Sequence, residues 1–238
     1  MSFSSGSVKF ILPVLALVIT VSSFGQDDGL WRVVRTNDFE VTGKGNSKHW
    51  ENTQWLKLKA YKKGQQDYKT QVKMMYSGKG MYFLFECEDR KITSTMNKDF
   101  MDLWKEDVVE VFLHSDTTLP SYFEYEVSPR NFELPLLISN VNGELLRWMP
   151  FYYEQDRKVI HKTHIEKTGD VVSKWTAEFF VPYKLLYPLR NNIPAPGMIW
   201  RANFYRVDYD GSQYASWLWQ ETRANFHDFE RFGRIQFE

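Results

Sequence analysis

The stretch Leu103–Leu113, LWKEDVVEVFL, joins a tryptophan to an alternating apolar run that carries one carboxylate. Successive side chains of a strand point to opposite faces, so one face is expected to hold Val109, Val111 and Leu113. Glu110 lies on the other face, where a charge is costly unless it is paired or meets a polar ligand. Trp104 stands just before the strand and offers a flat surface for ring stacking. The stretch therefore predicts a binding face on a β scaffold.

Strand-like runs separated by polar turns recur along the rest of the chain. We expect strands at residues 71–76, 81–86, 108–113, 122–128, 158–165, 171–181, 199–208 and 232–237. Helical turns are expected at 182–186 and at 100–105. Many short strands with one or two short helices are typical of an all-β protein, here an antiparallel β sandwich of immunoglobulin-like or jelly-roll-like build.

The first 25 residues have the pattern of a secretory signal peptide. Lys9 precedes the apolar run 10–21, and small residues end at Gly25, which predicts cleavage before Gln26. The apolar run is shorter than the roughly 20 residues of a spanning helix, so we expect no membrane insertion after cleavage. The expected organisation is a signal peptide at 1–25, a single domain at 26–238, and a secreted or periplasmic location.

The composition of the remaining chain narrows the classes of partner. Lys9 is the only charged residue before Gln26, which leaves 29 basic against 30 acidic side chains. A near-neutral chain lacks the basic excess that nucleic acid or an anionic membrane surface requires. The single cysteine, Cys87, lies in a strand-like run and is expected to be a buried apolar residue.

Alternation also predicts that polar side chains gather on one sheet face. If the 122–128 strand pairs with the 108–113 strand, Glu124 and Glu126 share a face with Glu110. In the 199–208 strand, Arg201, Asn203 and Tyr205 also share one face. Carboxylate, amide and guanidinium groups suit the recognition of neighbouring hydroxyls. The alternative is a hydrated outer face held together by cross-strand charge pairs.

A loop rich in oxygen ligands makes calcium a candidate cofactor. The residues in and around it are Asp89, Asn97, Asp99, Asp102 and Asp107. The alternative is a solvated acidic loop without a metal ion.

Four motifs, in order along the chain, resemble family 9 carbohydrate-binding modules. Residues 104–112, WKEDVVEVF, are similar to the family's W-x-x-D-x-V-E-[VI]-F signature. Residues 82–89 resemble its LY-x-x-x-x-x-D strand, and residues 175–182 its A-E-x-x-I-P strand. Residues 226–233, FHDFERFG, resemble its closing W-x-D-P-x-x-F-G. The resemblance implies a β sandwich of the DOMON type.

The resemblance also implies roles for individual residues. Trp104 and Phe226 fall on the two aromatic positions that clamp a terminal sugar, and Glu110 falls on a carboxylate that accepts hydrogen bonds from hydroxyls. Asn203 falls on a strand that lines the same face. In the family calcium supports the loops, and Asp89 is the residue that we expect to hold it.

This chain departs from the family at three positions that bind sugar in characterised members. Glu126 stands where characterised members have a sugar-binding arginine, and Ser128 where they have an asparagine. Phe226 stands where they have tryptophan. These changes predict a divergent, stand-alone module that binds a different glycan, with Glu126 and Ser128 among its ligand-binding residues.

Three other functions stay open. Relatives in the wider superfamily bind haem through Met, His or Lys, and Met96, Met101 and His227 lie near the proposed site. A glycoside hydrolase needs two carboxyl groups roughly 5 to 10 Å apart, which Glu124 and Glu126 satisfy by strand geometry. Exposed aromatic residues also suit a protein interface. The leading prediction is a non-catalytic carbohydrate-binding module that supports polysaccharide breakdown or capture alongside a separate glycoside hydrolase.

Overall fold

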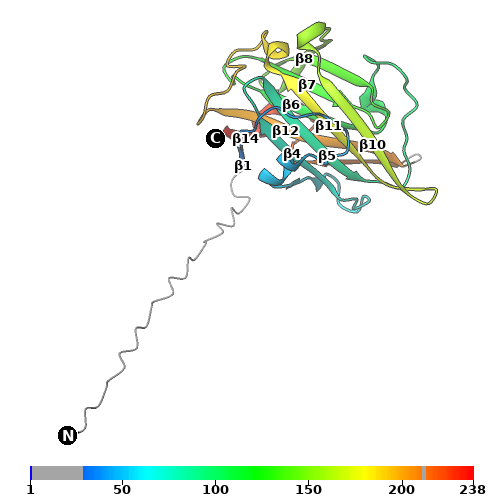
Figure 1. Cartoon of the computed structure of the whole chain (residues 1–238). Coiled ribbons are helices and arrows are strands. Elements are labelled where there is room, and N and C mark those ends of the chain that lie inside the picture. Colours follow the sequence, from blue (N-terminus) through cyan, green and yellow to red (C-terminus); the bar gives the residue numbers. More distant parts are fainter. Residues whose placement is uncertain (2–28, 211–212) are drawn as a thin grey trace.

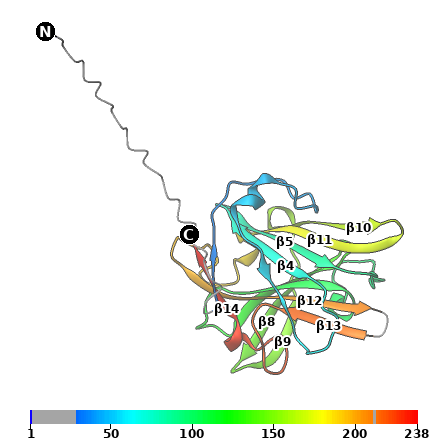
Figure 2. The ribbon, with the colours of Figure 1, turned by 90° about the horizontal axis from the view of Figure 1, so that it is seen from below.

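The chain folds as two β-sheets packed face to face. The computed structural model describes residue 1, residues 29–210 and residues 213–238. The predicted signal peptide and its cleavage site lie outside these residues. Figure 1 shows the layered arrangement, with the C-terminus beside β1 (Leu30–Val33). Figure 2, turned by 90°, shows strands of the two sheets one above the other. No helix of the described residues is both long and apolar enough to cross a membrane.

The larger sheet has nine strands. Its main path runs β1-β14-β12-β6-β7-β8-β9, and β13 pairs with both β12 and β3. All its pairings are antiparallel except that of β1 with β14. Besides β1, the strands are β3 (Lys59–Ala60), β6 (Val108–His114), β7 (Ser121–Val127), β8 (Glu133–Val141), β9 (Glu144–Pro150), β12 (Ile199–Asp210), β13 (Gln213–Leu218) and β14 (Gly233–Phe237).

The smaller sheet has five antiparallel strands in the order β10-β11-β5-β4-β2. They are β2 (Leu56–Lys57), β4 (Thr70–Tyr76), β5 (Gly80–Glu88), β10 (Ile160–Thr168) and β11 (Val171–Pro182). Short 3-10 turns connect strands of both sheets: η1 (Lys48–Asn52), η2 (Leu103–Lys105), η3 (Gln155–Arg157), η4 (Tyr183–Leu186) and η5 (Phe229–Arg231).

These observations confirm the predicted all-β antiparallel sandwich. Each of the eight predicted strands is present within a few residues of its expected ends. The two predicted helical turns correspond to η2 and η4. Cys87 is fully buried, as expected for an apolar role.

The main core lies between the sheets, where apolar side chains of both are removed from water. The predicted alternation of β6 is confirmed, because Val109, Val111 and Leu113 all belong to this core. Across from them, Phe83 of β5 stacks on Phe179 of β11 with ring centroids 5.1 Å apart.

The outer face of the larger sheet carries a second apolar cluster. Val108 and Phe112 of β6 join strand residues Tyr122, Leu134, Leu136, Ile138, Tyr205, Val207 and Leu218, and Leu103 and Phe232 cover them from loops. We call the face under this cluster the covered face. Since loops close over it, this face of the sheet is a second interior and not a solvated surface.

The ring of Trp219 packs so close to Gly233, at the start of β14, that no larger residue fits at this position. A Cβ atom there would lie 2.4 Å from atoms of the buried Trp219 ring. We expect Gly233→Ala to destabilise the fold by about 1 to 3 kcal/mol, because the ring has to leave its packed position. Gly78→Ala is the control, since the nearest atom lies 4.0 Å from that Cβ. Urea unfolding midpoints compare the two, and equal midpoints would contradict the expectation.

Candidate functional site

Strand register brings three glutamates together on the covered face. Glu110 of β6 lies opposite Glu126 of β7, and Glu124 lies opposite Phe112 in the next row. Since β12 pairs with the other side of β6, Tyr205 lies opposite Glu110 and Asn203 opposite Phe112. The predicted grouping of these polar side chains is confirmed. We call Glu110, Glu124 and Glu126 the acidic triad.

The alternative of a hydrated outer face is wrong. The exposed fractions of Glu110, Glu124 and Glu126 are 3%, 4% and 0%. Loop residues such as Leu103 and Phe232 close over the face, which alternation within the strands alone does not reveal. Burial removes the water molecules that would otherwise hydrogen-bond to each of these three carboxyl groups.

Burial also changes the protonation of the acidic triad. Loss of water raises the pKa of Glu110 well above its usual range, and the charge of Glu124 adds to the shift. Burial raises the pKa of Glu124 to about 8. The pKa of Glu126 is raised by burial and then by repulsion from Glu110 and Glu124. In water these groups ionise near pH 4, so the fold favours their neutral forms.

Two aromatic rings flank the acidic triad. Trp104 lies on η2, with 44% of its surface exposed, and η2 contacts β7. The backbone N–H of Trp104 faces the carboxyl group of Glu126. Phe226 stacks on Tyr205 of β12, with ring centroids 4.1 Å apart and an interplanar angle of 12°. Since β6 runs between β7 and β12, Glu110 lies between the two aromatic positions.

Asn203 lies on β12 as predicted, whereas Ser128 lies just after the end of β7, and both side chains are engaged within the protein. The amide of Asn203 donates to the Tyr205 hydroxyl (2.7 Å) and to the carbonyl of Gln220 (2.9 Å), and its oxygen accepts from the Gln220 N–H (3.0 Å). The Ser128 hydroxyl accepts from the N–H of Phe132 (3.3 Å) in the turn after β7. Asn203 therefore positions Tyr205 and the 220 segment, and Ser128 closes a turn.

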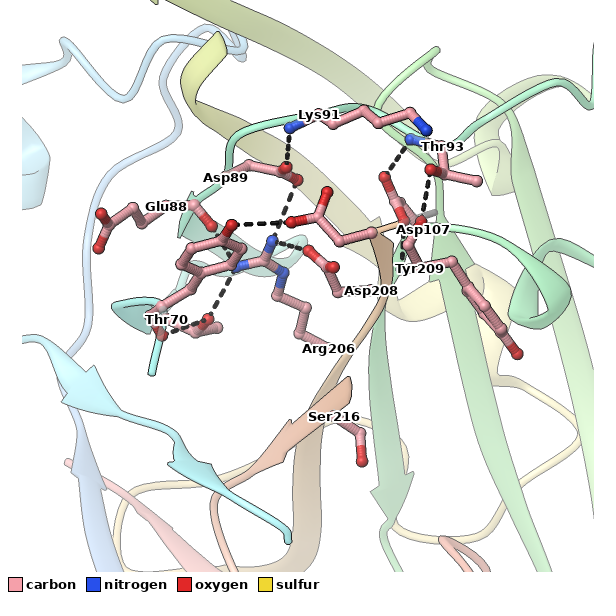
Figure 3. A network of polar contacts seen from close by, with 12 residues as sticks. Thr70, Glu88, Asp89, Lys91, Thr93, Asp107, Arg206, Asp208, Tyr209 and Ser216 are labelled. Atoms are coloured by element: carbon pink, nitrogen blue, oxygen red, sulfur yellow. Dashed lines mark hydrogen bonds and ion pairs between the residues drawn. The ribbon is translucent and has the colours of Figure 1, made fainter. Parts of the chain in front are cut away.

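Asp89 lies in a buried ion-pair network that joins the two sheets (Figure 3). A guanidinium N–H of Arg206 donates to Asp89 Oδ2 (3.0 Å), and the same nitrogen contacts Asp208. Arg206 also donates to Thr70 Oγ1 (3.1 Å) and to the carbonyl of Glu88 (2.5 Å). The side chains of all three charged residues are at most 1% exposed.

The oxygen ligands proposed for calcium are engaged by other groups. Asp89 accepts from Arg206 and from the N–H of Lys91, and Asp107 accepts from the N–H groups of Thr93 and Tyr209. Asp102 pairs with Lys105. Among the described residues no cluster of three or more His, Cys, Asp or Glu side chains is arranged to hold a metal ion. These residues as placed do not form a calcium site, and calcium binding stays an untested prediction.

The three side chains considered as haem ligands, Met96, Met101 and His227, differ in their burial and contacts. Met96 packs against the covered-face cluster, and Met101 is 37% exposed. His227 Nδ1 hydrogen-bonds to the Tyr122 hydroxyl (2.7 Å), and burial lowers the pKa of His227 to about 4. The contact of Tyr122 with His227 at this face was not predicted, although alternation places Tyr122 beside Glu124.

Fold and site together define a carbohydrate-binding β-sandwich module, with aromatic rings and polar groups on one sheet face. The chain belongs to the carbohydrate family 9 binding domain-like family, whose model matches residues 41–238. None of the curated proteins matches the chain.

Solved structures agree on the fold. The chain is similar to a putative carbohydrate-binding protein from Bacteroides uniformis, with 14% identity, a TM-score of 0.72, and coverage of 89% of this chain and 100% of that one. A family 9 carbohydrate-binding module from Caldicellulosiruptor kristjanssonii in complex with glucose has 18% identity and a TM-score of 0.63, over 88% of this chain and 95% of that one. The same module in complex with cellotriose has 18% identity and a TM-score of 0.62, over 87% of this chain and 94% of that one.

Proposed function

We propose that this chain is an exported, non-catalytic domain that binds the end of a saccharide chain. The sugar ring lies between Trp104 and Phe226, and its hydroxyls donate to Glu110 and Glu126. The single observation that carries the proposal is the exposed Trp104, whose backbone N–H faces the buried Glu126 of the acidic triad. Family membership and the relative in complex with glucose support the ligand class.

Admission of a sugar requires Phe226 to leave its position on the Tyr205 ring. Phe226 covers Tyr205, which lies beside Glu110 in the sheet. Phe226 comes from the connection between β13 and β14, whose regular structure among the described residues is limited to η5. Trp104 already presents a free surface, although Lys105 Nζ lies 4.9 Å from its ring centroid. The strands hold the carboxyl groups, and the connection between β13 and β14 supplies the Phe226 wall of the proposed site.

Replacing Trp104 tests the proposal directly. We expect Trp104→Ala to weaken binding of glucose and cellotriose by at least about tenfold, because a well-buried aromatic contact contributes roughly 1 to 3 kcal/mol. Isothermal titration calorimetry measures both affinities. Trp148→Ala is the matched control, since Trp148 is 47% exposed and lies on β9 at the edge of the same sheet.

Two results would contradict the proposal. Equal sugar binding by the Trp104→Ala and wild-type chains would remove the site from this face. Hydrolysis of a chromogenic glycoside by the wild type, lost in Glu110→Gln, would contradict the non-catalytic role and favour a glycoside hydrolase.

Export and partnership complete the proposal. Cleavage before Gln26 releases the domain to the periplasm or the exterior, where it holds polysaccharide for a separately encoded glycoside hydrolase. Determining the N-terminus of the mature chain tests cleavage. A chain that starts at Met1 in purified extracellular or periplasmic fractions would contradict it.

A further inference from the structure

The acidic triad differs from every other buried carboxyl cluster described in this protein. Glu178 accepts from the Trp50 indole N–H (2.8 Å) and from backbone N–H groups such as that of Gly43 (2.7 Å). Glu133 accepts from the hydroxyl groups of two tyrosines. Asp89 and Asp208 share the guanidinium of Arg206. Each of these carboxylates has a donor from a backbone N–H, an indole, a hydroxyl or a guanidinium group, although Asp208 Oδ1 is also buried without a partner.

The acidic triad has few such donors: the backbone N–H of Trp104 faces Glu126, and the carboxyl groups of Glu124 and Glu126 approach each other. Both carboxyl oxygens of Glu126 and one of Glu124 are buried without a hydrogen-bond partner. Within residues 29–210 and 213–238, no lysine or arginine forms an ion pair with the triad. Among the described residues, His227 is the basic side chain that approaches the triad: its Nδ1 lies 3.9 Å from Glu124 Oε2 and hydrogen-bonds to the Tyr122 hydroxyl. With its pKa lowered to about 4 by burial, His227 is neutral at pH 7.

Unpartnered buried carboxyl groups indicate which ligand group belongs there. Each such oxygen costs free energy that a donor restores, and a cation also offsets the repulsion among three acids. A protonated amine carries three N–H donors and one positive charge, whereas a hydroxyl brings a single neutral donor. A bound metal ion is a poorer match, because the described residues hold no suitable cluster of ligands.

We propose that the site takes an amino sugar whose free, protonated amine lies among Glu110, Glu124 and Glu126. This inference rests on the proposed function, because Trp104 and Phe226 still hold the sugar ring. The amine is the group that selects this ligand over a neutral sugar. An N-acetylated sugar lacks the charge and two of the three donors, so the site discriminates against it.

Calorimetric titration with three monosaccharides separates this inference from the proposed function. The probes are glucosamine, glucose and N-acetylglucosamine at about pH 6, where an amine is protonated. We expect glucosamine to bind at least about tenfold more tightly than the other two. Since the acidic triad must ionise to pair with the amine, glucosamine binding should also release protons, seen as a dependence of the heat on buffer ionisation enthalpy.

Glu126→Gln is the diagnostic variant. It keeps the size of the side chain but cannot ionise, so we expect the ratio of glucosamine affinity to glucose affinity to fall to about one. Glucose is titrated alongside, because Glu126 also accepts from sugar hydroxyls in the proposed function. Glu144→Gln is the control, since Glu144 is exposed on β9 and changes the net charge equally. Circular dichroism and thermal unfolding confirm that both variants are folded.

Each other outcome has a definite meaning. Equal affinities for the three sugars, all lost in Trp104→Ala, would keep the proposed function and overturn the amino-sugar inference. Absence of binding to every sugar by folded wild-type protein would overturn both. Tight binding of calcium or magnesium chloride alone that Glu126→Gln removes would show a cation site and overturn the inference.

Discussion

Replacement of Arg206 by methionine is expected to lower the free energy of unfolding by about 3 to 5 kcal/mol at pH 7.5. Arg206 lies on the face of β12 that points between the sheets, opposite Val109 of β6. Its guanidinium group joins Asp89 and Asp208, and its flat side packs over Trp217 with 4.7 Å between Cζ and the ring centroid. Without the cation, two carboxyl groups stay buried without a counter-ion.

Urea unfolding of wild type and variant measures this loss. Arg147→Met is the matched control, because Arg147 is exposed on β9 and its replacement should change stability by less than about 0.5 kcal/mol. Adding Asp89→Asn and Asp208→Asn to Arg206→Met should restore part of the loss, since neutral side chains remove the unpaired charges. A single variant as stable as the wild type would show that the network contributes nothing.

The same variant should be less damaged at low pH. Burial raises the pKa of Asp208 to about 6 and also raises that of Asp89, although Arg206 opposes both shifts. Without Arg206 both pKa values rise further. Near pH 5 the two groups are then protonated in the folded variant, and the cost of their burial becomes smaller.

Much of this fold could be predicted from alternation within single strands. Val108 to Leu113 shows it most clearly, since its two sets of side chains enter two different apolar clusters. The prediction missed β8, where Pro135 interrupts the run and argues against a central strand. It is accommodated because pairing of β8 with β9 ends at Leu136 opposite Pro150, one residue away, while its carbonyl accepts from the N–H of Phe151. The parallel pairing of β1 with β14 joins chain ends that no local pattern connects.

The candidate site could be predicted only as a set of side chains that share a face. Glu110 and Glu126 were placed together by period-two spacing, which pairing then confirmed. Their burial depends on loops from distant parts of the chain, including Phe232, and spacing carries no information on such loops. Arg206 did leave a signal, since it follows Phe204 on the apolar side of β12, where a charge needs a partner. That partner, Asp89, was assigned to calcium instead.

The acidic triad should make the protein less stable as pH rises above neutrality. Burial raises the pKa of Glu124 to about 8, and the pKa values of Glu110 and Glu126 are also raised. Between the unfolded value, near 4.3, and the folded value, the folded chain holds a proton that the unfolded chain has released. The folded state therefore holds one more proton per group than the unfolded state, and stability falls by about 1.4 kcal/mol per pH unit for each such proton.

The window above about pH 7.5 separates most of this effect from the histidines. Burial lowers the pKa values of His114, His161 and His227, so the folded state gains stability as pH rises through the unfolded histidine value near 6.5. About one unit above that value the unfolded histidines are neutral and their contribution is nearly constant. Glu124 alone then predicts a loss of about 1 kcal/mol between pH 7.5 and 9.

Urea midpoints measured across that window should fall with pH in the wild type and in Glu144→Gln, but less steeply in Glu124→Gln. The slope is the diagnostic quantity, because a change in overall stability on introducing the amide displaces all points equally. A wild-type midpoint that is flat or rises between pH 7.5 and 9 would mean that the acidic triad is already ionised and solvated. Such a result would also remove the unpartnered carboxyl groups on which selection of an amine depends.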